Sequence, residues 1–263
     1  MKQADKIHRQ VADFYGKRIS GNCCAPAIKG GTLVEYDAEA LGNVAPELTE
    51  SSFGCGNPLA FAAIPAGATV LDLGSGAGLD LLLAAERVGP AGKVIGVDMT
   101  DAMIERARAN IARAGVGNIE VRKGQIEALP LPDNSVDWVI SNCVINLSPQ
   151  KDRVFSEIAR VLKPGGQFSI SDLVVRDLPW WARASSFLYS ACVAGAIGED
   201  EYLRGLQAAG LQQVSVSERS LYEPVQLVGL IEDMLPGATR RIAAAAATRV
   251  WSAKFVGRKS LAH

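Results

Sequence analysis

The sequence predicts an α/β protein built on a doubly wound, mostly parallel, Rossmann-like sheet. Between residues 69 and 175, short apolar runs rich in β-formers alternate with longer stretches whose apolar residues recur at helical spacing. Strand–helix–strand units of this kind give right-handed crossovers and parallel strands. Ligands then bind beyond the carboxyl ends of the strands, so the residues that follow each strand are the candidates for a site.

Local signals bound the elements of this core. Gly89 and Gly115 end two amphipathic helices, Thr100 stands at the N-cap of the second, and Ser148–Pro149 begins a third. A Pro-Gly-Gly turn at 164–166 precedes the last core strand. The expected strands span residues 69–73, 93–98, 119–123, 135–141 and 167–175, and the expected helices span 79–88, 101–114 and 149–162.

Segments on both sides of this core extend the fold. We expect an N-terminal helical cap that carries cysteines over residues 1–65, a ligand-binding core with substrate-side helices over 66–220, and a C-terminal helix and strand over 221–263. The amphipathic pattern near residues 5–18 favours a helix that covers the strand ends. The other elements expected are helices near 37–50, 180–193, 199–209 and 240–247, and strands near 213–220 and 248–256.

The charge balance and the hydropathy exclude some classes of partner. The 263 residues hold 27 basic and 28 acidic side chains with 6% aromatics, so no basic, base-stacking surface for nucleic acid is expected. No apolar leader and no uninterrupted apolar span is present, so we expect no membrane partner and a cytoplasmic location. The five cysteines are an odd number and argue against a disulfide scaffold. The only histidines, His8 and His263, leave the middle of the chain without the commonest general base.

The segment "DLGSGAG" at 72–78 places glycines between the first strand and its helix, where a backbone can approach a ligand closely. A dinucleotide fingerprint would need glycine at position 79, which is Leu79 here. Asp98 ends the second strand, where a carboxylate accepts hydrogen bonds from a ribose diol. Two other interpretations of this segment stand beside a ligand loop of another kind. It could belong to an NAD-linked dehydrogenase, or its glycines could form a turn that serves packing alone.

This combination resembles the class I S-adenosylmethionine methyltransferases, whose first motif "DLGSGAG" matches. "RVLKPGG" at 160–166 is a further similarity. The resemblance implies S-adenosylmethionine as cofactor, with the glycine loop against its methionyl part, Asp98 on its ribose, and Met99 and the segment 124–130 beside its adenine. The cofactor-binding residues it implies are Asp72, Gly74, Ser75, Gly76, Gly78, Asp98, Met99, Thr100, Gln125, Ile126, Glu127 and Asn142.

The cysteines are the second group of candidates. Cys143 follows the fourth strand, and the helix after the fifth strand could carry Cys192 over the same mouth. Each of these two could equally be a small buried hydrophobe. Cys55, in "FGCGNP", and the adjacent pair Cys23–Cys24 lie in the cap, in loops poor in core packing. A site assembled from such distant cysteines without histidine would be all sulfur, and thiolates select thiophilic metals and metalloids.

Here the sequence resembles the arsenite S-adenosylmethionine methyltransferases, through "FGCGNP" (53–58), "GKVIGVDMT" (92–100), "SNCVINLSP" (141–149) and "CVAGA" (192–196). The resemblance implies trivalent arsenic bound at Cys55, Cys143 and Cys192, with Cys24, chosen over Cys23, completing the thiol set. Arsenite or its thiol conjugates would be the substrate, and thioredoxin or glutathione the reductant. Gln125, Gln150 and Phe53 stand where the family usually has an acid, an aspartate and a tyrosine.

Three hypotheses follow for the reaction. The first is methyl transfer to thiolate-bound arsenic, whose lone pair needs no base to activate it, followed by reduction through a transient disulfide. The second is methylation of an organic small molecule on the same fold, with the cysteines as packing residues. The third is a protein that binds or senses the metalloid without turning it over.

Overall fold

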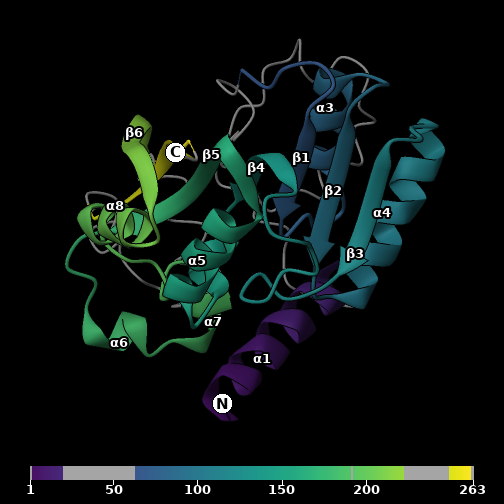
Figure 1. The fold of residues 1–263 in the computed structure, drawn as a ribbon. Helices are drawn as coiled ribbons and strands as arrows, with labels where there is room; N and C mark the ends of the chain where they lie inside the picture. Colours follow the sequence, from purple (N-terminus) through teal and green to yellow (C-terminus); the bar gives the residue numbers. More distant parts are fainter. Residues whose placement is uncertain (1, 20–62, 191, 222–248, 262–263) are drawn as a thin grey trace.

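The computed structural model of the chain describes residues 2–19, 63–190, 192–221 and 249–261. Its centre is a seven-stranded sheet in the order β3-β2-β1-β4-β5-β7-β6 (Figure 1). The strands β1 to β5 pair in parallel, and β7 pairs antiparallel with both β5 and β6. The strands are β1 (Thr69–Leu73), β2 (Lys93–Asp98), β3 (Ile119–Lys123), β4 (Val136–Asn142), β5 (Leu162–Val175), β6 (Leu211–Leu221) and β7 (Val250–Lys259). The expected doubly wound, mostly parallel sheet is confirmed.

Helices cover both faces of the sheet, and each face has its own apolar core. The described helices are α1 (Lys2–Ile19), α3 (Leu79–Val88), α4 (Asp101–Ala114), α5 (Lys151–Val161), α6 (Trp180–Arg183), α7 (Ser186–Ser190) and α8 (Glu199–Ala208), with a 3-10 turn η1 (Ile145–Leu147). On one face, Val70 and Ile140 pack with residues of α3 and α4. On the other face, Leu71 and Ile170 pack with residues of α5 and α8. Because both faces of the central strands are buried, those strands are apolar on both sides.

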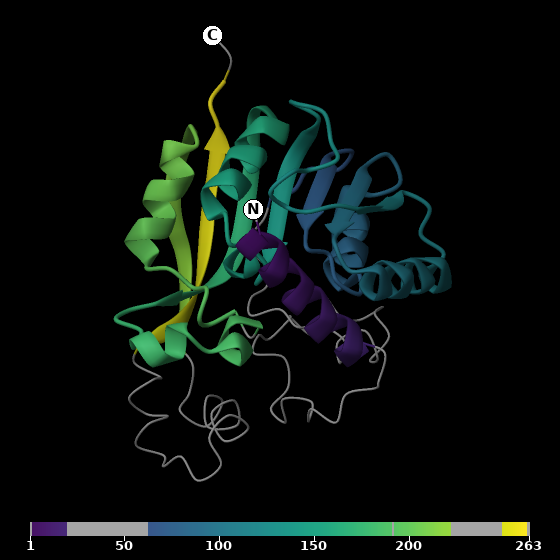
Figure 2. The same cartoon turned by 90° about the horizontal axis from the view of Figure 1, so that it is seen from below.

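A third apolar cluster lies at the carboxyl ends of the strands. It joins Val11 of α1 to Cys143, Leu173 and Cys192 and to residues of α6 and α7. Helix α1 packs against α4 and α7, and in Figure 2, seen from below, its purple ribbon crosses in front of the rest of the molecule. The N-terminal helix therefore covers the edge at which a parallel sheet binds its ligands.

Two boundaries near β5 differ from the sequence prediction. The preceding helix begins at Lys151, with Gln150 as N-cap, so Pro149 lies outside it. Strand β5 begins at Leu162, and the Pro-Gly-Gly segment at 164–166 belongs to the strand where we expected a turn. Pairing over long distances overrides the local turn signal, because Leu162 aligns with Val136 of β4 and the amide of Gly165 donates to the carbonyl of Ser260.

The helix expected over 180–193 was also wrong. The chain forms two short helices, α6 and α7, and Cys192 lies in the turn after α7 with a left-handed φ of 63°. The last strand spans 250–259 where 248–256 was expected. The helices expected at 37–50 and 240–247, and Cys23, Cys24 and Cys55, lie outside the described residues. In the segments that the structure does describe, we find no helix with the length and apolarity needed to cross a membrane.

Candidate active site

A pocket of about 960 Å³, its open mouth included, lies at the carboxyl ends of β1 to β4. Four loops and helix α1 line it. The lining residues are His8, Val11, Tyr15, Gly74, Ser75, Gly76, Ala77, Leu79, Asp80, Asp98, Met99, Thr100, Met103, Gly124, Gln125, Ile126, Glu127, Asn142, Cys143, Val144, Leu147 and Ser148.

The glycine loop after β1 forms the floor of the pocket. Gly74 has a left-handed φ of 67°, and a Cβ at that position would lie 2.7 Å from the Cβ of Val144. The amide of Gly74 donates to the carbonyl of Val97, which ties the loop to β2. The hydroxyl of Ser75 is buried and has no hydrogen-bond partner among the described residues. The loop thus offers bare backbone and a free polar group to a ligand.

The carboxylate of Asp98, at the end of β2, fixes two loops at once. It accepts hydrogen bonds from the amide of Gly76 at 3.0 Å and from the amide of Thr100 at 2.8 Å. Thr100 is the N-cap of α4 as expected, but its side chain makes no capping bond. Burial raises the pKa of Asp98 above its usual value, and the backbone donors oppose that rise. The side chain of Thr100 and the amide of Met99 also donate to this carboxylate, which faces the pocket at the end of β2.

Two further carboxylates lie near Asp98. Asp72 is buried at the end of β1, and burial together with the charges of Asp80 and Asp98 raises its pKa well above the usual range. Asp80 lines the pocket and accepts a hydrogen bond from Asn142 at 3.2 Å. Neighbouring acids that disfavour the ionisation of Asp72 make this side of the pocket favourable to a bound cation.

On the β3 side, the pocket wall is held by a histidine from α1. The Nε2 of His8 donates to Glu127 at 2.9 Å, and its Nδ1 accepts from the side-chain amide of Gln125 at 3.3 Å. The hydroxyl of Ser148 donates to the same Glu127 oxygen at 2.5 Å. We expected no histidine here. Helix α1 brings one in from the N-terminus, and the histidine count in the sequence contains no signal of that contact.

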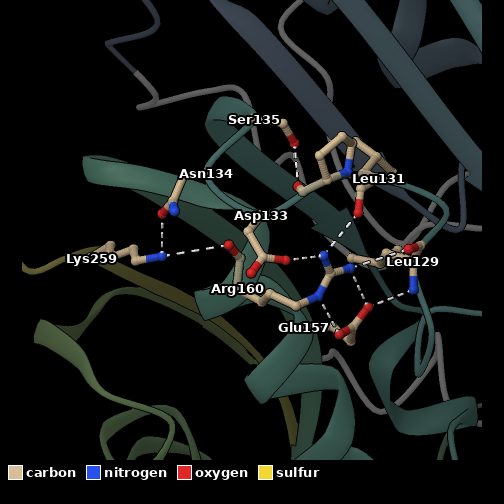
Figure 3. A network of polar contacts seen from close by, with 9 residues as sticks. Leu129, Leu131, Asp133, Asn134, Ser135, Glu157, Arg160 and Lys259 are labelled. Carbon is tan, nitrogen blue, oxygen red and sulfur yellow. Dashed lines mark hydrogen bonds and ion pairs between the residues drawn. The ribbon is translucent and has the colours of Figure 1, made fainter.

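The segment that follows Glu127 is held in turn by Arg160 of α5 (Figure 3). Its guanidinium donates to the carbonyls of Leu129 and Leu131, at 3.2 and 2.8 Å, and pairs with Glu157 and Asp133. Glu157 accepts the amide of Leu129 at 2.6 Å. These bonds fix the loop on which Ile126 and Glu127 face the pocket.

Cys143 and Cys192 are brought together beside this pocket. Cys143 lines the pocket at the end of β4, and the thiol of Cys192 donates to the carbonyl of Cys143 at 2.9 Å. Both residues have left-handed backbone, with φ of 56° and 63°, which is uncommon for side chains other than glycine and asparagine. Such backbone costs of order 1–3 kcal/mol and clusters at functional sites.

The surroundings of Cys192 keep it a neutral thiol. Burial, and then the charge of Asp172, raise its pKa, while a hydrogen bond with Tyr15 and the charge of Lys151 lower it. The hydroxyl of Tyr15 lies 3.9 Å from the sulfur of Cys192 and donates to the carbonyl of Ser190. Cys143 is disulfide-bonded, and its partner lies outside the described residues.

Most of the expected cofactor residues line the pocket, apart from Asp72 and Gly78. Asp72 lies behind the wall, and Gly78 is the N-cap of α3. Of the expected sulfur set, the structure brings together Cys143 and Cys192, whereas Cys55 and Cys24 lie outside the described residues. Within the part of the chain that the structure describes, no three His, Cys, Asp or Glu side chains are gathered as a metal site. The pocket-lining residues that the sequence did not indicate are His8, Val11, Tyr15, Leu79, Asp80, Met103, Leu147 and Ser148.

The pocket fits S-adenosylmethionine. The bare backbone of the glycine loop and the unpartnered Ser75 hydroxyl suit the methionyl part, and the carboxylates behind them suit a sulfonium and an ammonium. Asp98 lines the pocket at the end of β2, where a carboxylate suits the ribose hydroxyls, and Met99 and Ile126 offer an apolar wall for the adenine.

Comparisons with known proteins agree with this assignment. Residues 64–210 match the family model described as a methyltransferase domain. The chain is 46% identical over 202 residues to an arsenite methyltransferase of Halobacterium salinarum, covering 76% of this chain and 51% of that protein. It is 35% identical over 240 residues to one of Aquipseudomonas alcaligenes, covering 82% and 68%. The crystal structure of an arsenic (III) S-adenosylmethionine methyltransferase from Chlamydomonas reinhardtii superposes with a TM-score of 0.70 at 36% identity, over 90% of this chain and 75% of that one.

Fold, pocket and family model together assign the chain to the class I methyltransferase fold, whose cofactor is S-adenosylmethionine. The chain spans about half the length of the Halobacterium relative and about two thirds of the Aquipseudomonas one. Within its class, the chain belongs to the arsenite methyltransferase family.

Proposed function

We propose that this chain transfers a methyl group from S-adenosylmethionine to trivalent arsenic held by the thiolates of Cys143, Cys192 and Cys55. The substrate is arsenite or its thiol conjugates, and the products are methylated arsenicals. The observation that carries the proposal is the placement of the two described cysteines. Cys143 lines the cofactor pocket, and the thiol of Cys192 reaches its carbonyl oxygen.

The chemistry of the site favours a soft acceptor. When bound, S-adenosylmethionine supplies an electrophilic methyl group on a sulfonium. Arsenic(III) held by sulfur keeps a lone pair and carries no proton, so its attack needs alignment and no general base. The described residues beside the two sulfurs fit this requirement, since Cys143, Tyr15 and Leu147 line the pocket wall and none of them is a strong base.

Binding and turnover place different demands on the cysteines. Each thiol that binds arsenite loses its proton to an arsenic-bound hydroxyl, which leaves as water. Transfer of the methyl group takes the arsenic lone pair, and two cysteine thiolates can return these two electrons by forming a disulfide. We assign this step to the set that includes Cys24 of the cap, residues 1–65. Thioredoxin or glutathione then reduces the disulfide, which requires a reducing compartment such as the cytoplasm.

A product assay with cysteine variants tests the proposal. The reduced protein is incubated with arsenite, glutathione and S-adenosylmethionine that carries a deuterated methyl group, and arsenicals are separated and identified by mass spectrometry. We expect deuterated methylarsenicals from the wild type and a loss of about 100-fold in Cys143→Ser and Cys192→Ser, which corresponds to about 2.7 kcal/mol in the barrier. Cys23→Ser, the same change at a cysteine without an assigned role, is the matched control.

The other outcomes identify the alternatives. Arsenite binding without methylated product would mean a binding or sensing protein. Undiminished methylation in Cys143→Ser and Cys192→Ser would remove these residues from the site. Turnover of an organic acceptor in those variants, with no arsenical product from the wild type, would leave a methyltransferase for organic small molecules. Binding of S-adenosylmethionine, followed by calorimetry, should stay within about threefold in both variants, because each change replaces a single side-chain atom and leaves the rest of the pocket lining in place.

A further inference from the structure

A buried carboxyl group on β5 lies behind the two cysteines. Asp172 has no solvent exposure. It accepts hydrogen bonds from the backbone amide of Asn146 at 3.2 Å, from the side-chain amide of Asn146 at 2.8 Å, from the amide of Leu173 at 2.9 Å and from the hydroxyl of Tyr202 at 3.3 Å. It does not line the cofactor pocket. Burying a carboxyl group costs free energy, which hydrogen bonds such as these four offset in part.

Asp172 fixes the loop that carries Cys143. The amide of Cys143 donates to the carbonyl of Ser171 at 2.9 Å, and the chain then turns through η1. After this turn, Asn146 contacts β5 again. Its side-chain nitrogen donates to the carboxylate of Asp172 at 2.8 Å and to the carbonyl oxygen of Leu173 at 2.7 Å. Both partners are acceptors, so only the nitrogen of the amide fits there. The Cys143 loop is thus tied to β5 at both of its ends.

The loop that carries Cys192 also packs against Asn146. A Cβ at Gly195 would collide with the carbonyl oxygen of Asn146, so the 192–196 loop rests directly on that carbonyl. The hydroxyl of Tyr189 donates to the carbonyl of Leu147 at 3.2 Å, and the thiol of Cys192 donates to Cys143 itself. A shift of Asn146 therefore changes the position of both sulfurs.

We propose that Asp172 is a positioning residue of the thiol site, which acts through Asn146 to set the separation of the Cys143 and Cys192 sulfurs so that one arsenic atom can bind both. This inference rests on the proposed function, because it assigns the two cysteines to arsenic. It goes beyond that function by placing the control of the sulfur pair in a side chain that touches neither arsenic nor cofactor. Second-layer groups of this kind typically change metal affinity by 10–100-fold.

Phenylarsine oxide is a suitable probe, because it releases one water as it forms two arsenic–sulfur bonds and so reports two thiols within reach of one atom. A background in which Cys23, Cys24 and Cys55 are serine leaves Cys143 and Cys192 as the only thiols. Asp172→Asn keeps the shape of the side chain but replaces an acceptor by a donor opposite Asn146. In the reduced background we expect it to bind the probe at least about 10-fold more weakly, with affinity for S-adenosylmethionine unchanged within about twofold.

Tyr202→Phe is the matched control, because it removes one hydrogen bond from the same carboxylate and leaves Asn146 in place. It should bind the probe within about twofold of the background. Alkylation of each cysteine by iodoacetamide, which needs one thiol only, should proceed at similar rates in all three proteins. Should Asp172→Asn not fold, Asn146→Ser removes the same link from the other side, and we expect the same selective loss.

The assignment is overturned by unchanged probe affinity in Asp172→Asn, or in Asn146→Ser where that variant replaces it. A parallel loss of probe and S-adenosylmethionine affinity overturns it as well, because that result means a general structural role. Failure of the proposed function appears in a different arm. In that arm, phenylarsine oxide would bind the background protein no more tightly than its Cys192→Ser derivative. That result would reject the arsenic site and the positioning role together.

Discussion

The thiol of Cys192 donates to the carbonyl oxygen of Cys143 across 2.9 Å, although 49 positions separate the two residues in the chain. Cys143 reaches this point from the end of β4, and Cys192 reaches it from the turn after α7. Both are held in left-handed backbone. The contact therefore couples the wall of the cofactor pocket to the turn on which the second sulfur lies.

Replacement of Gly74 by alanine should damage the cofactor site. Gly74 has a left-handed φ, and a Cβ would overlap with the side chain of Val144. We expect S-adenosylmethionine affinity to fall by about 10-fold or more, since strain and overpacking each cost about 1 kcal/mol or more. Calorimetric titration measures this. Gly67→Ala is the control, because its φ is also left-handed but nothing lies within 4 Å of the new Cβ. Equal affinity in the two variants would contradict the close approach of Gly74 and Val144.

Removal of the imidazole of His8 should loosen helix α1 from the pocket. His8→Ala deletes the hydrogen bonds to Glu127 and Gln125, and the net value of a hydrogen bond to a charged group is about 1.5–3 kcal/mol. We expect S-adenosylmethionine to bind about 10-fold more weakly. Arg9→Ala, one position along, removes an exposed side chain that, among the described residues, donates to the carbonyl of Asp5 in its own helix, and should bind the cofactor normally. Indistinguishable titrations of the two variants would show that the His8 contact does not contribute to binding.

The carboxyl group of Asp72 should make cofactor binding sensitive to charge. S-adenosylmethionine carries a sulfonium that its demethylated product lacks. Because burial and two neighbouring acids raise the pKa of Asp72, the negative form that attracts a cation becomes more populated as the pH rises. The ratio of substrate to product affinity should therefore increase with pH in the wild type. In Asp72→Asn this ratio should be about threefold to tenfold smaller, as expected for charges several ångströms apart near a protein surface. A ratio that is unchanged by the substitution would argue against the charge effect.

Asp172 should make the stability of the protein depend on pH. Burial raises its pKa from 3.8 to about 7. Between these values the folded state holds a proton that the unfolded state has lost, so this group stabilises the fold at low pH and the contribution is lost as the pH rises to about 7. Urea unfolding of wild type and Asp172→Asn at intervals from pH 4 to pH 8 should show a flatter profile for the variant. Glu86→Gln, an exposed change of equal charge on α3, should leave the wild-type slope in place.

The central strands and the glycine loop could be predicted because their signals are local. The expected strands at 69–73, 93–98 and 119–123 and the helix at 79–88 have the bounds that the structure gives them. Each of these elements is an apolar run that ends at a turn-forming residue. The strands are apolar on both sides because both faces of the sheet are covered. Asp98 could be placed at the ligand edge for the same reason, since the end of a parallel strand fixes its position.

The remainder depends on contacts between distant residues. The first residues of β5 join the sheet through Val136 and Ser260, which a local Pro-Gly-Gly signal cannot show. His8 meets Glu127 across 119 positions, so its role in the pocket has no local signature. The apolar spacing near 180–193 suggests one helix, yet the left-handed backbone at Cys192 requires the helix to end before it. Tertiary packing overrides propensity at each of these points.

The antiparallel strand β7 joins two strands that precede it in the chain, β5 and β6. Among the described strands, β6 pairs only with β7, and β5 has β7 as its outer neighbour. A nascent chain that has not yet emerged from the ribosome past position 250 therefore leaves the long apolar edge of β5 open and β6 without a neighbour. Open strand edges attract other chains. Chaperone demand and aggregation during synthesis should thus be greatest in the interval before β7 emerges.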